Sequence, residues 1–178
     1  MTKLIALTGP AGSGKTTAAE ALMEQGWTRV KFAATLKNMA RCMGLTDDHI
    51  EGHLKEEPVE WLGGRTPRYV MQSLGTEWGR RMIHPQVWVW ITQREILSNL
   101  AHGRHVVVDD CRFDNEAAMI RQLGGKIVRL EGRGGIAGGH ESEKGVSEWD
   151  MTIRNDEPLA AFKGRVVYVL SGGGDEAV

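Results

Sequence analysis

The sequence is poor in cysteine, in long apolar stretches and in net charge. Its 178 residues include two cysteines, Cys42 and Cys111, which form no CxxC pair, so zinc ribbons and thioredoxin-like redox chemistry are unsupported. The formal net charge of -1 gives no global attraction to nucleic acid or membrane surfaces. No apolar stretch is long enough for a signal sequence or a membrane span. We therefore expect a soluble cytoplasmic protein that has reduced thiols and binds neither nucleic acid nor membranes.

What the sequence does contain is an alternation of short apolar stretches with longer amphipathic ones. The apolar stretches predict buried strands near residues 3–8, 27–32, 105–109, 126–130 and 150–154. The amphipathic stretches predict helices near residues 15–24, 36–43, 67–81, 87–100, 115–123 and 159–170. The polar segment 46–64 is expected to run over the surface, and the glycine-rich segment 132–145 to form a flexible loop. This order predicts a single α/β domain with a five-stranded parallel sheet flanked by helices.

A GxxxxGK[ST] pattern lies at the first predicted strand-to-helix turn. Its glycines let backbone N–H groups approach phosphates closely. The ammonium group of Lys15 would lie beside the β- and γ-phosphates of ATP, and the Thr16 hydroxyl is suited to coordinate Mg²⁺. A switch GTPase would need a base-reading segment such as NKxD, which is absent, and a motor is normally larger, so a small kinase is favoured. The loop residues expected to bind ATP are Gly9, Ala11, Gly12, Ser13, Gly14, Lys15, Thr16 and Thr17.

The predicted strand at 105–109 ends in two carboxylates that are followed closely by an arginine. Asp109 and Asp110 lie where the chemistry of open α/β sheets is found, at the carboxyl end of a strand. A carboxylate there can hold Mg²⁺ through water or accept a proton, and Arg112 can clamp a phosphoryl group. The simpler alternative is an aspartate that caps the following helix. Of the two carboxylates, we favour Asp110 as the catalytic and metal-binding group.

Four segments beyond the phosphate loop match motifs of a known family. They are residues 31–37 (similar to FADPLK), 66–80 (TPR…Q.LGTE.GR), 110–117 (DVRF.NEA) and 140–156 (H.SE…D..I.ND). In these segments and in their order, the chain resembles the deoxynucleoside monophosphate kinases of bacteriophages, a branch of the P-loop kinases. The matches extend from Leu4 to about Leu159. Each segment alone is short, so their shared order carries the resemblance.

The resemblance implies a P-loop kinase that transfers the γ-phosphoryl group of ATP, with Mg²⁺, to a deoxynucleoside monophosphate. It implies a helical acceptor-binding region at about 45–100, a small mobile lid at about 132–148, and a location in the host cytoplasm if the protein is viral. Arg112 and Arg133 would stabilise the transferred group, and Asn155 and Asp156 would lie near the adenine of ATP. The implied acceptor-side residues are Phe32, Lys37, Arg68, Gln72, Thr76, Glu77, Trp78 and Arg80.

The sequence also departs from the family and leaves alternatives open. Ala34 and Thr35 stand where the family often has Asp and Pro, and Glu157 stands where a glycine is common. The segment 140–156 also resembles dephospho-CoA kinases, so another small acceptor is an alternative. A non-catalytic nucleotide-binding module would explain the phosphate loop, but not the arginine-rich stretch 65–81 or the lid. Family analogy suggests a homodimer, and the preferred base is open.

Overall fold

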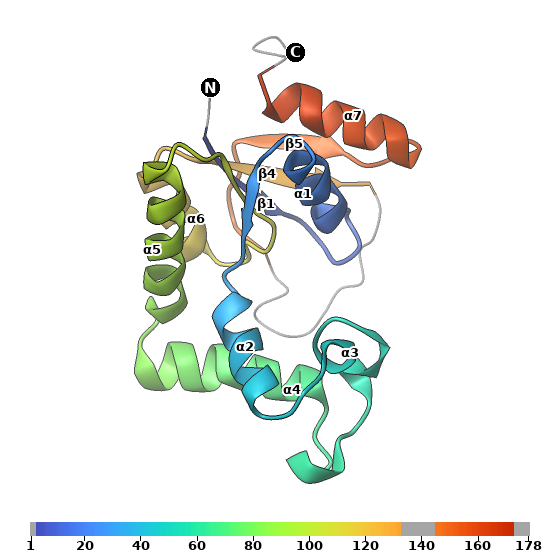
Figure 1. Cartoon of the computed structure of the whole chain (residues 1–178), viewed down its shortest axis with the longest axis vertical. Helices are drawn as coiled ribbons and strands as arrows, with labels where there is room; N and C mark the ends of the chain where they lie inside the picture. Colours follow the sequence, from blue (N-terminus) through green and yellow to red (C-terminus); the bar gives the residue numbers. More distant parts are fainter. Residues whose placement is uncertain (1–2, 133–144, 173–178) are drawn as a thin grey trace. The chain divides into compact units, whose positions relative to one another are not determined.

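The computed structural model of the chain describes residues 3–132 and 145–172 (Figure 1). The chain forms two compact units. The first unit takes the residues up to Lys31 together with those from Thr92 onward, and the second runs from Phe32 to Ile91. This second unit begins and ends earlier than the helical region expected at about 45–100. Most of the expected lid, including Arg133, lies outside the described residues.

A five-stranded parallel sheet forms the centre of the first unit, as the sequence predicted. Its spatial order is β2-β3-β1-β4-β5. The central strand β1 is buried along its whole length, and it pairs Ile5 with Val107 of β3 and Ala6 with Ile127 of β4. Continuous burial explains why β1 and β3 read as uninterrupted apolar runs, whereas the other strands include polar residues that are partly buried or exposed. The strands are β1 (Leu4–Thr8), β2 (Thr28–Val30), β3 (Val106–Val108), β4 (Lys126–Glu131) and β5 (Met151–Arg154).

Helices cover both faces of this sheet. Ile5 of β1 belongs to a core cluster with Leu22 of the first helix and Phe162 of the last. Leu4 faces the other way, because side chains alternate along a strand. Its side chain and that of Ile120 both lie within 3 Å of the point that a Cβ on Gly125 would occupy. The helices are α1 (Lys15–Met23), α6 (Asp114–Gln122), α7 (Leu159–Leu170) and α5 (Val87–Ala101), the last spanning the boundary between the units.

The second unit is helical and has a small core of its own. Its buried cluster contains Ala40, Leu45, Ile50, Val59 and Met71, which come from successive elements of the unit. This shared core holds the short elements together, although none is long enough to be stable alone. The elements are α2 (Ala34–Cys42), α3 (Asp47–Ile50), η1 (His53–Glu56), η2 (Glu60–Leu62), α4 (Pro67–Gln72) and η3 (Ser73–Ile83).

The single helix predicted over 67–81 is in fact two helices of different type. After α4 the chain continues as a π-helix, η3, which runs to Ile83. The indole of Trp88 lies against η3 and donates a hydrogen bond from Nε1 to the carbonyl oxygen of Gly75 at 2.7 Å. A Cβ on Gly79 would stand 2.5 Å from this indole. The sequence pattern predicted a helix here but not its wider π-helical turn, because that turn accompanies the packing of Trp88 against η3.

None of the helices in the described ranges is both long enough and apolar enough to cross a membrane.

The close contact between Gly79 and Trp88 yields a matched test. Gly79→Ala should lower the free energy of unfolding by about 1–3 kcal/mol, because the added methyl overlaps the buried indole. Gly75→Ala is the control, since its Cβ would meet Leu36 at an ordinary 3.5 Å. Alanine is favoured over glycine inside helices by roughly 0.5–1 kcal/mol, so this variant should be neutral or slightly stabilised. Urea unfolding measures both, and equal losses would contradict the packing described here.

Candidate functional site

The phosphate loop joins β1 to α1 and depends on glycine at defined positions. Gly9, Gly12 and Gly14 all have positive φ angles, of 133°, 77° and 99°. A Cβ on Gly9 would stand 2.4 Å from the carbonyl oxygen of Leu130 on β4. The first glycine is therefore required by its close approach to a neighbouring strand as well as by its backbone conformation. The loop is held against the sheet before any ligand binds.

The loop leads into the N-terminus of α1. Gly14 occupies the N-cap position and has no side chain that could accept a hydrogen bond from the first N–H groups of the helix. These donors and the helix dipole form an anion-binding end. Thr16 is exposed in the first turn of α1, whereas Thr17 is partly buried and Ser13 is fully buried. The Thr16 hydroxyl is thus open to a ligand or a metal.

Lys15 folds back over the loop in this structure. Its Nζ donates to the carbonyl oxygens of Gly9 and Pro10, both at 2.7 Å, and lies 3.4 Å from the hydroxyl of Ser13. Burial, together with the positive charge of Arg112, lowers the pKa of Lys15 to about 8. The carbonyls satisfy the ammonium group without neutralising its charge, so an anionic phosphate would be a better partner.

Asp109 is buried at the end of β3 between two cations that the sequence analysis missed. Its carboxylate lies 3.7 Å from Arg29 Nη1 and 3.5 Å from Lys31 Nζ, and the side chain is 2% exposed. Burial raises the pKa of Asp109, as does the negative charge of Asp110, and these effects outweigh the two cations. Its Oδ1 atom is buried and has no hydrogen-bond partner among the described residues. The signal that could have been read was the i, i+2 spacing of Arg29 and Lys31, which puts both on one side of the strand.

The strand-end group expected from the sequence lies beside the phosphate loop. Asp109 and Asp110 both raise the pKa of Lys15, whereas Arg112 lowers it, so all three charges act on this lysine. Asp110 is partly buried and Arg112 is exposed. β1 and β3 are neighbours in a parallel sheet, so their carboxyl ends meet at one edge.

The N-terminus of α6 is capped by a buried glutamate, so the aspartates are not needed as caps. The N-cap residue is Phe113. The Glu116 carboxylate accepts hydrogen bonds from the backbone N–H groups of Arg112 at 2.8 Å and Phe113 at 3.2 Å. Glu116 is 2% exposed. It fixes the turn that carries Asp110 and Arg112, and sequence reasoning did not find it.

Asn155 supports the phosphate loop, a contact not anticipated for it. The side-chain amide donates to the carbonyl oxygen of Ser13 at 3.0 Å, and the backbone N–H donates to Glu131 at 2.6 Å. A Cβ on Gly14 would stand 2.4 Å from the same amide nitrogen. The neighbouring Asp156 is exposed. Asn155 therefore ties the end of β5 to the loop.

The acceptor-side residues expected from the family lie in the second unit, spread over three helices. On α2 and α4, Lys37 Nζ forms an ion pair with Glu51 at 2.5 Å, and the Arg68 guanidinium forms one with Glu56. Phe32, at the start of the unit, is buried. Two of the three expected acceptor-side cations thus each have a carboxylate partner in this structure.

The remaining expected residues lie at the end of α4 and along η3. Thr76 is buried and Gln72 is partly buried. The Glu77 carboxylate is 3.9 Å from the Arg81 guanidinium. Other contacts are made by Arg80, which donates to Pro85 O at 3.4 Å, and by Trp78, whose ring centroid is 6.3 Å from that of Trp88. Trp78 is 38% exposed, so part of its ring is open to a ligand.

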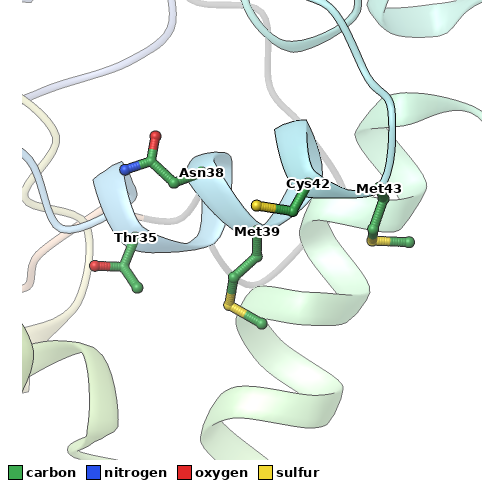
Figure 2. A pocket seen from close by; sticks show the side chains of 5 residues that line it. All are labelled: Thr35, Asn38, Met39, Cys42 and Met43. Atoms are coloured by element: carbon green, nitrogen blue, oxygen red, sulfur yellow. The ribbon is translucent and has the colours of Figure 1, made fainter.

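A separate hollow of about 470 Å³ follows one side of α2 (Figure 2). Its lining residues recur at intervals of three and four along a single helix, as one helix face requires. It contains none of the residues expected to bind the acceptor. The lining residues are Thr35, Asn38, Met39, Cys42 and Met43.

Comparison with known proteins relates the chain to nucleotide kinases. The sequence model described as deoxynucleotide monophosphate kinase matches residues 48–166. A protein of Acanthamoeba polyphaga mimivirus, provisionally named a deoxynucleotide monophosphate kinase, is 32% identical over 187 residues, which cover 92% of this chain and 94% of that protein. The deoxynucleoside-5'-monophosphate kinase of Escherichia phage T5 is 29% identical over 89 residues, covering 46% of this chain and 35% of that protein.

A solved structure supports the fold. A provisionally assigned kinase from Chloroflexus aurantiacus aligns with a TM-score of 0.51 at 16% identity, over 98% of this chain and 100% of the other. At this level of identity the likeness bears on the fold alone.

The hydrogen bond from Asn155 to the loop gives a direct test. Asn155→Ala should lower the free energy of unfolding by about 1–3 kcal/mol, because the buried Ser13 carbonyl loses its donor. It should also weaken the binding of a phosphorylated ligand to the loop. Asp156→Ala is the matched control, since Asp156 is exposed and should tolerate the change. Thermal unfolding with and without ligand measures both effects, and equal behaviour of the two variants would argue against the support role.

Proposed function

This chain belongs to the deoxynucleotide monophosphate kinase family, and we propose that it transfers the γ-phosphoryl group of ATP to a deoxynucleoside monophosphate. Membership rests on the family match to residues 48–166 and on the mimivirus relative, which aligns over 92% of the chain. The mechanism is supported by the charges of Asp110 and Arg112, which act on Lys15, and by the parallel pairing of β1 with β3, the strands that precede these residues. The products are ADP and the deoxynucleoside diphosphate.

The phosphate loop is the proposed ATP site. Its inward N–H groups and the start of α1 would hold the β- and γ-phosphates. Lys15 would leave the carbonyls of Gly9 and Pro10 and turn to these phosphates, since an anion is a stronger partner than a neutral carbonyl. The buried, partly desolvated environment strengthens that interaction. Asn155 keeps the loop in the geometry that this exchange requires.

The oxygen donors at this edge of the sheet fit Mg²⁺. The ion prefers oxygen ligands and is usually held by one or two protein groups, several waters and substrate phosphates. Thr16 offers an exposed hydroxyl and Asp110 a carboxylate. The Oδ1 of Asp109, which has no hydrogen-bond partner among the described residues, could accept a hydrogen bond from a water of the ion. When bound, Mg²⁺ neutralises charge on the transferred phosphoryl group.

Transfer is proposed to be direct and in line. An oxygen of the acceptor phosphate bonds to the γ-phosphorus while the bond to the β–γ bridging oxygen breaks, and ADP departs with that oxygen. The attacking phosphate is already ionised at neutral pH, so no general base is needed. Arg112 would stabilise charge on the equatorial oxygens. Arg133 is proposed for the same task from the family pattern and lies outside the described residues.

The second unit is proposed to bind the acceptor. Lys37, Arg68 and Arg80 are the cations available for its phosphate. The exposed part of Trp78 is available to stack on the base, since stacking needs only an open ring face. Further polar groups are provided by Gln72 at the end of α4 and by Thr76 and Glu77 on η3. The homodimer suggested by family analogy stays a prediction.

Release of ADP tests the proposed reaction. ATP and Mg²⁺ are supplied with each of the four deoxynucleoside monophosphates in turn, and with dephospho-CoA as the alternative acceptor. We expect ADP release to be stimulated by at least one deoxynucleoside monophosphate and not by dephospho-CoA. Lys15→Ala should lower this release by at least about 100-fold, because it removes a charge aimed at the reacting phosphates.

The control for this variant is its far-ultraviolet circular dichroism, which should match that of the wild type because Lys15 is not part of the core cluster. Tight ATP binding without acceptor-dependent release would instead indicate a non-catalytic nucleotide-binding module. Near-normal turnover of a folded Lys15→Ala variant would refute the role of the phosphate loop.

The two neighbouring aspartates should differ in their effect on rate. Asp110→Asn should lower kcat by at least about tenfold, because it removes a proposed Mg²⁺ ligand from beside Lys15. Asp109→Asn should lower it less, since the Asp109 carboxylate pairs with Arg29 and Lys31 and acts on the reaction through its neighbours. The comparison is made at saturating ATP and Mg²⁺. A larger decrease in kcat for Asp109→Asn than for Asp110→Asn would indicate that Asp109, and not Asp110, is the Mg²⁺ ligand.

A further inference from the structure

A short acidic segment in the second unit pairs with basic side chains from α2 and α4. This acidic segment, residues 47–57, contains α3 and η1. In this segment Asp47 pairs with Arg41 at 2.8 Å, Glu51 pairs with Lys37 at 2.5 Å, and Glu56 pairs with Arg68. Three carboxylates of one segment therefore neutralise three cations on two helices.

The segment is fixed by packing as well as by charge. Ile50 of α3 is fully buried in the cluster that also contains Ala40 of α2 and Met71 of α4. The backbone of the acidic segment thus cannot move far without opening that core. Its acidic side chains, in contrast, are largely outside the core: those of Glu51 and Glu56 are 48% and 60% exposed. Their carboxylates can rotate away while the backbone stays in place.

Two of the three cations are those assigned to the acceptor phosphate. Lys37 and Arg68 lie on different helices, yet both pair with carboxylates only five residues apart in the chain. The third cation, Arg41, has no assigned contact with the acceptor. Its guanidinium is held by Asp47 through Nε and Nη2, at 2.9 and 2.8 Å, and it also donates to Asn38. The Arg41–Asp47 pair is therefore a comparable ion pair in the same segment that is not assigned to acceptor binding.

We propose that Glu51 and Glu56 are counter-charges that the acceptor phosphate displaces, and that they lower the affinity of the acceptor site for phosphorylated ligands. This rests on the proposed function, because it takes Lys37 and Arg68 as acceptor contacts. In this view Glu51 and Glu56 tune the affinity for the acceptor. They do not touch the reacting atoms.

The charge of the acceptor phosphate explains how it can displace both carboxylates. A phosphate monoester carries about −1.5 to −2 charges at pH 7, so one phosphate group can replace two carboxylates at Lys37 and Arg68. A neutral nucleoside cannot replace either, and a monoanion can replace only one. Exposed ion pairs of this kind are weak, in general worth up to about a fivefold change in an equilibrium constant. The carboxylates thus weaken the binding of the acceptor phosphate without preventing it.

Neutral variants test the proposal under steady-state turnover. Glu51→Gln and Glu56→Gln remove the charge and keep the shape, and each should lower the KM for the deoxynucleoside monophosphate by about twofold to fivefold. The double variant should lower it further, and kcat should stay within about twofold, since the transfer site is unchanged. The probes are the four deoxynucleoside monophosphates. The matched deoxynucleosides, used as competitive inhibitors, should bind the variants and the wild type equally because they carry no phosphate.

Asp47→Asn is the control from the same segment. It removes an equivalent ion pair, that with Arg41, and should leave the KM for the acceptor unchanged. A KM that is unchanged or raised in the Glu51→Gln Glu56→Gln double variant would overturn the proposal, as would an equal decrease in Asp47→Asn. A wild type that turns over no deoxynucleoside monophosphate would overturn the proposed reaction and this proposal together. Wild-type turnover with an unresponsive double variant would overturn this proposal alone.

Discussion

The phosphate loop depends on a hydrogen bond between residues that are 142 positions apart, from the Asn155 amide to the Ser13 carbonyl. The loop must turn its N–H groups inward, and that conformation uses positive φ angles at Gly9, Gly12 and Gly14. Such a backbone gains little from local contacts, so neighbouring strands have to hold it. The carbonyl oxygen of Leu130, a residue of β4, lies against Gly9, and Asn155 directly follows β5. The parallel sheet supplies both supports, because the carboxyl ends of β1, β4 and β5 lie side by side at one edge.

Charge at this edge of the sheet is concentrated locally, although the net charge of the chain is only -1. Four cations (Lys15, Arg29, Lys31 and Arg112) and two carboxylates (Asp109 and Asp110) interact electrostatically there, so cations outnumber carboxylates. Burial raises the pKa of Cys111 well above its usual value, and the charge of Glu116 raises it further. A protonated thiol is a poor nucleophile and a poor metal ligand. The chemistry at this edge is therefore left to oxygen donors and cations.

The sequence was sufficient for features that local pattern determines. The glycine and lysine spacing of the loop, the five buried strands and the carboxylates after β3 could all be read from short stretches. Contacts that join distant segments could not. Arg29 and Lys31 looked like ordinary polar residues around a short strand, and only the pairing of β2 with β3 brings them to Asp109. Likewise, the π-helix accompanies the packing of Trp88 on Gly75 and Gly79, which no helical periodicity reveals.

The cations assigned to phosphate binding are already occupied by internal ligands in both units. Lys15 is held by loop carbonyls, whereas Lys37 and Arg68 are held by carboxylates. Binding a phosphate therefore exchanges one partner for another, and its net gain is the difference between them. The difference is large where the internal ligand is neutral and small where it is charged. The phosphate loop should consequently bind its polyphosphate more strongly than the second unit binds the acceptor phosphate.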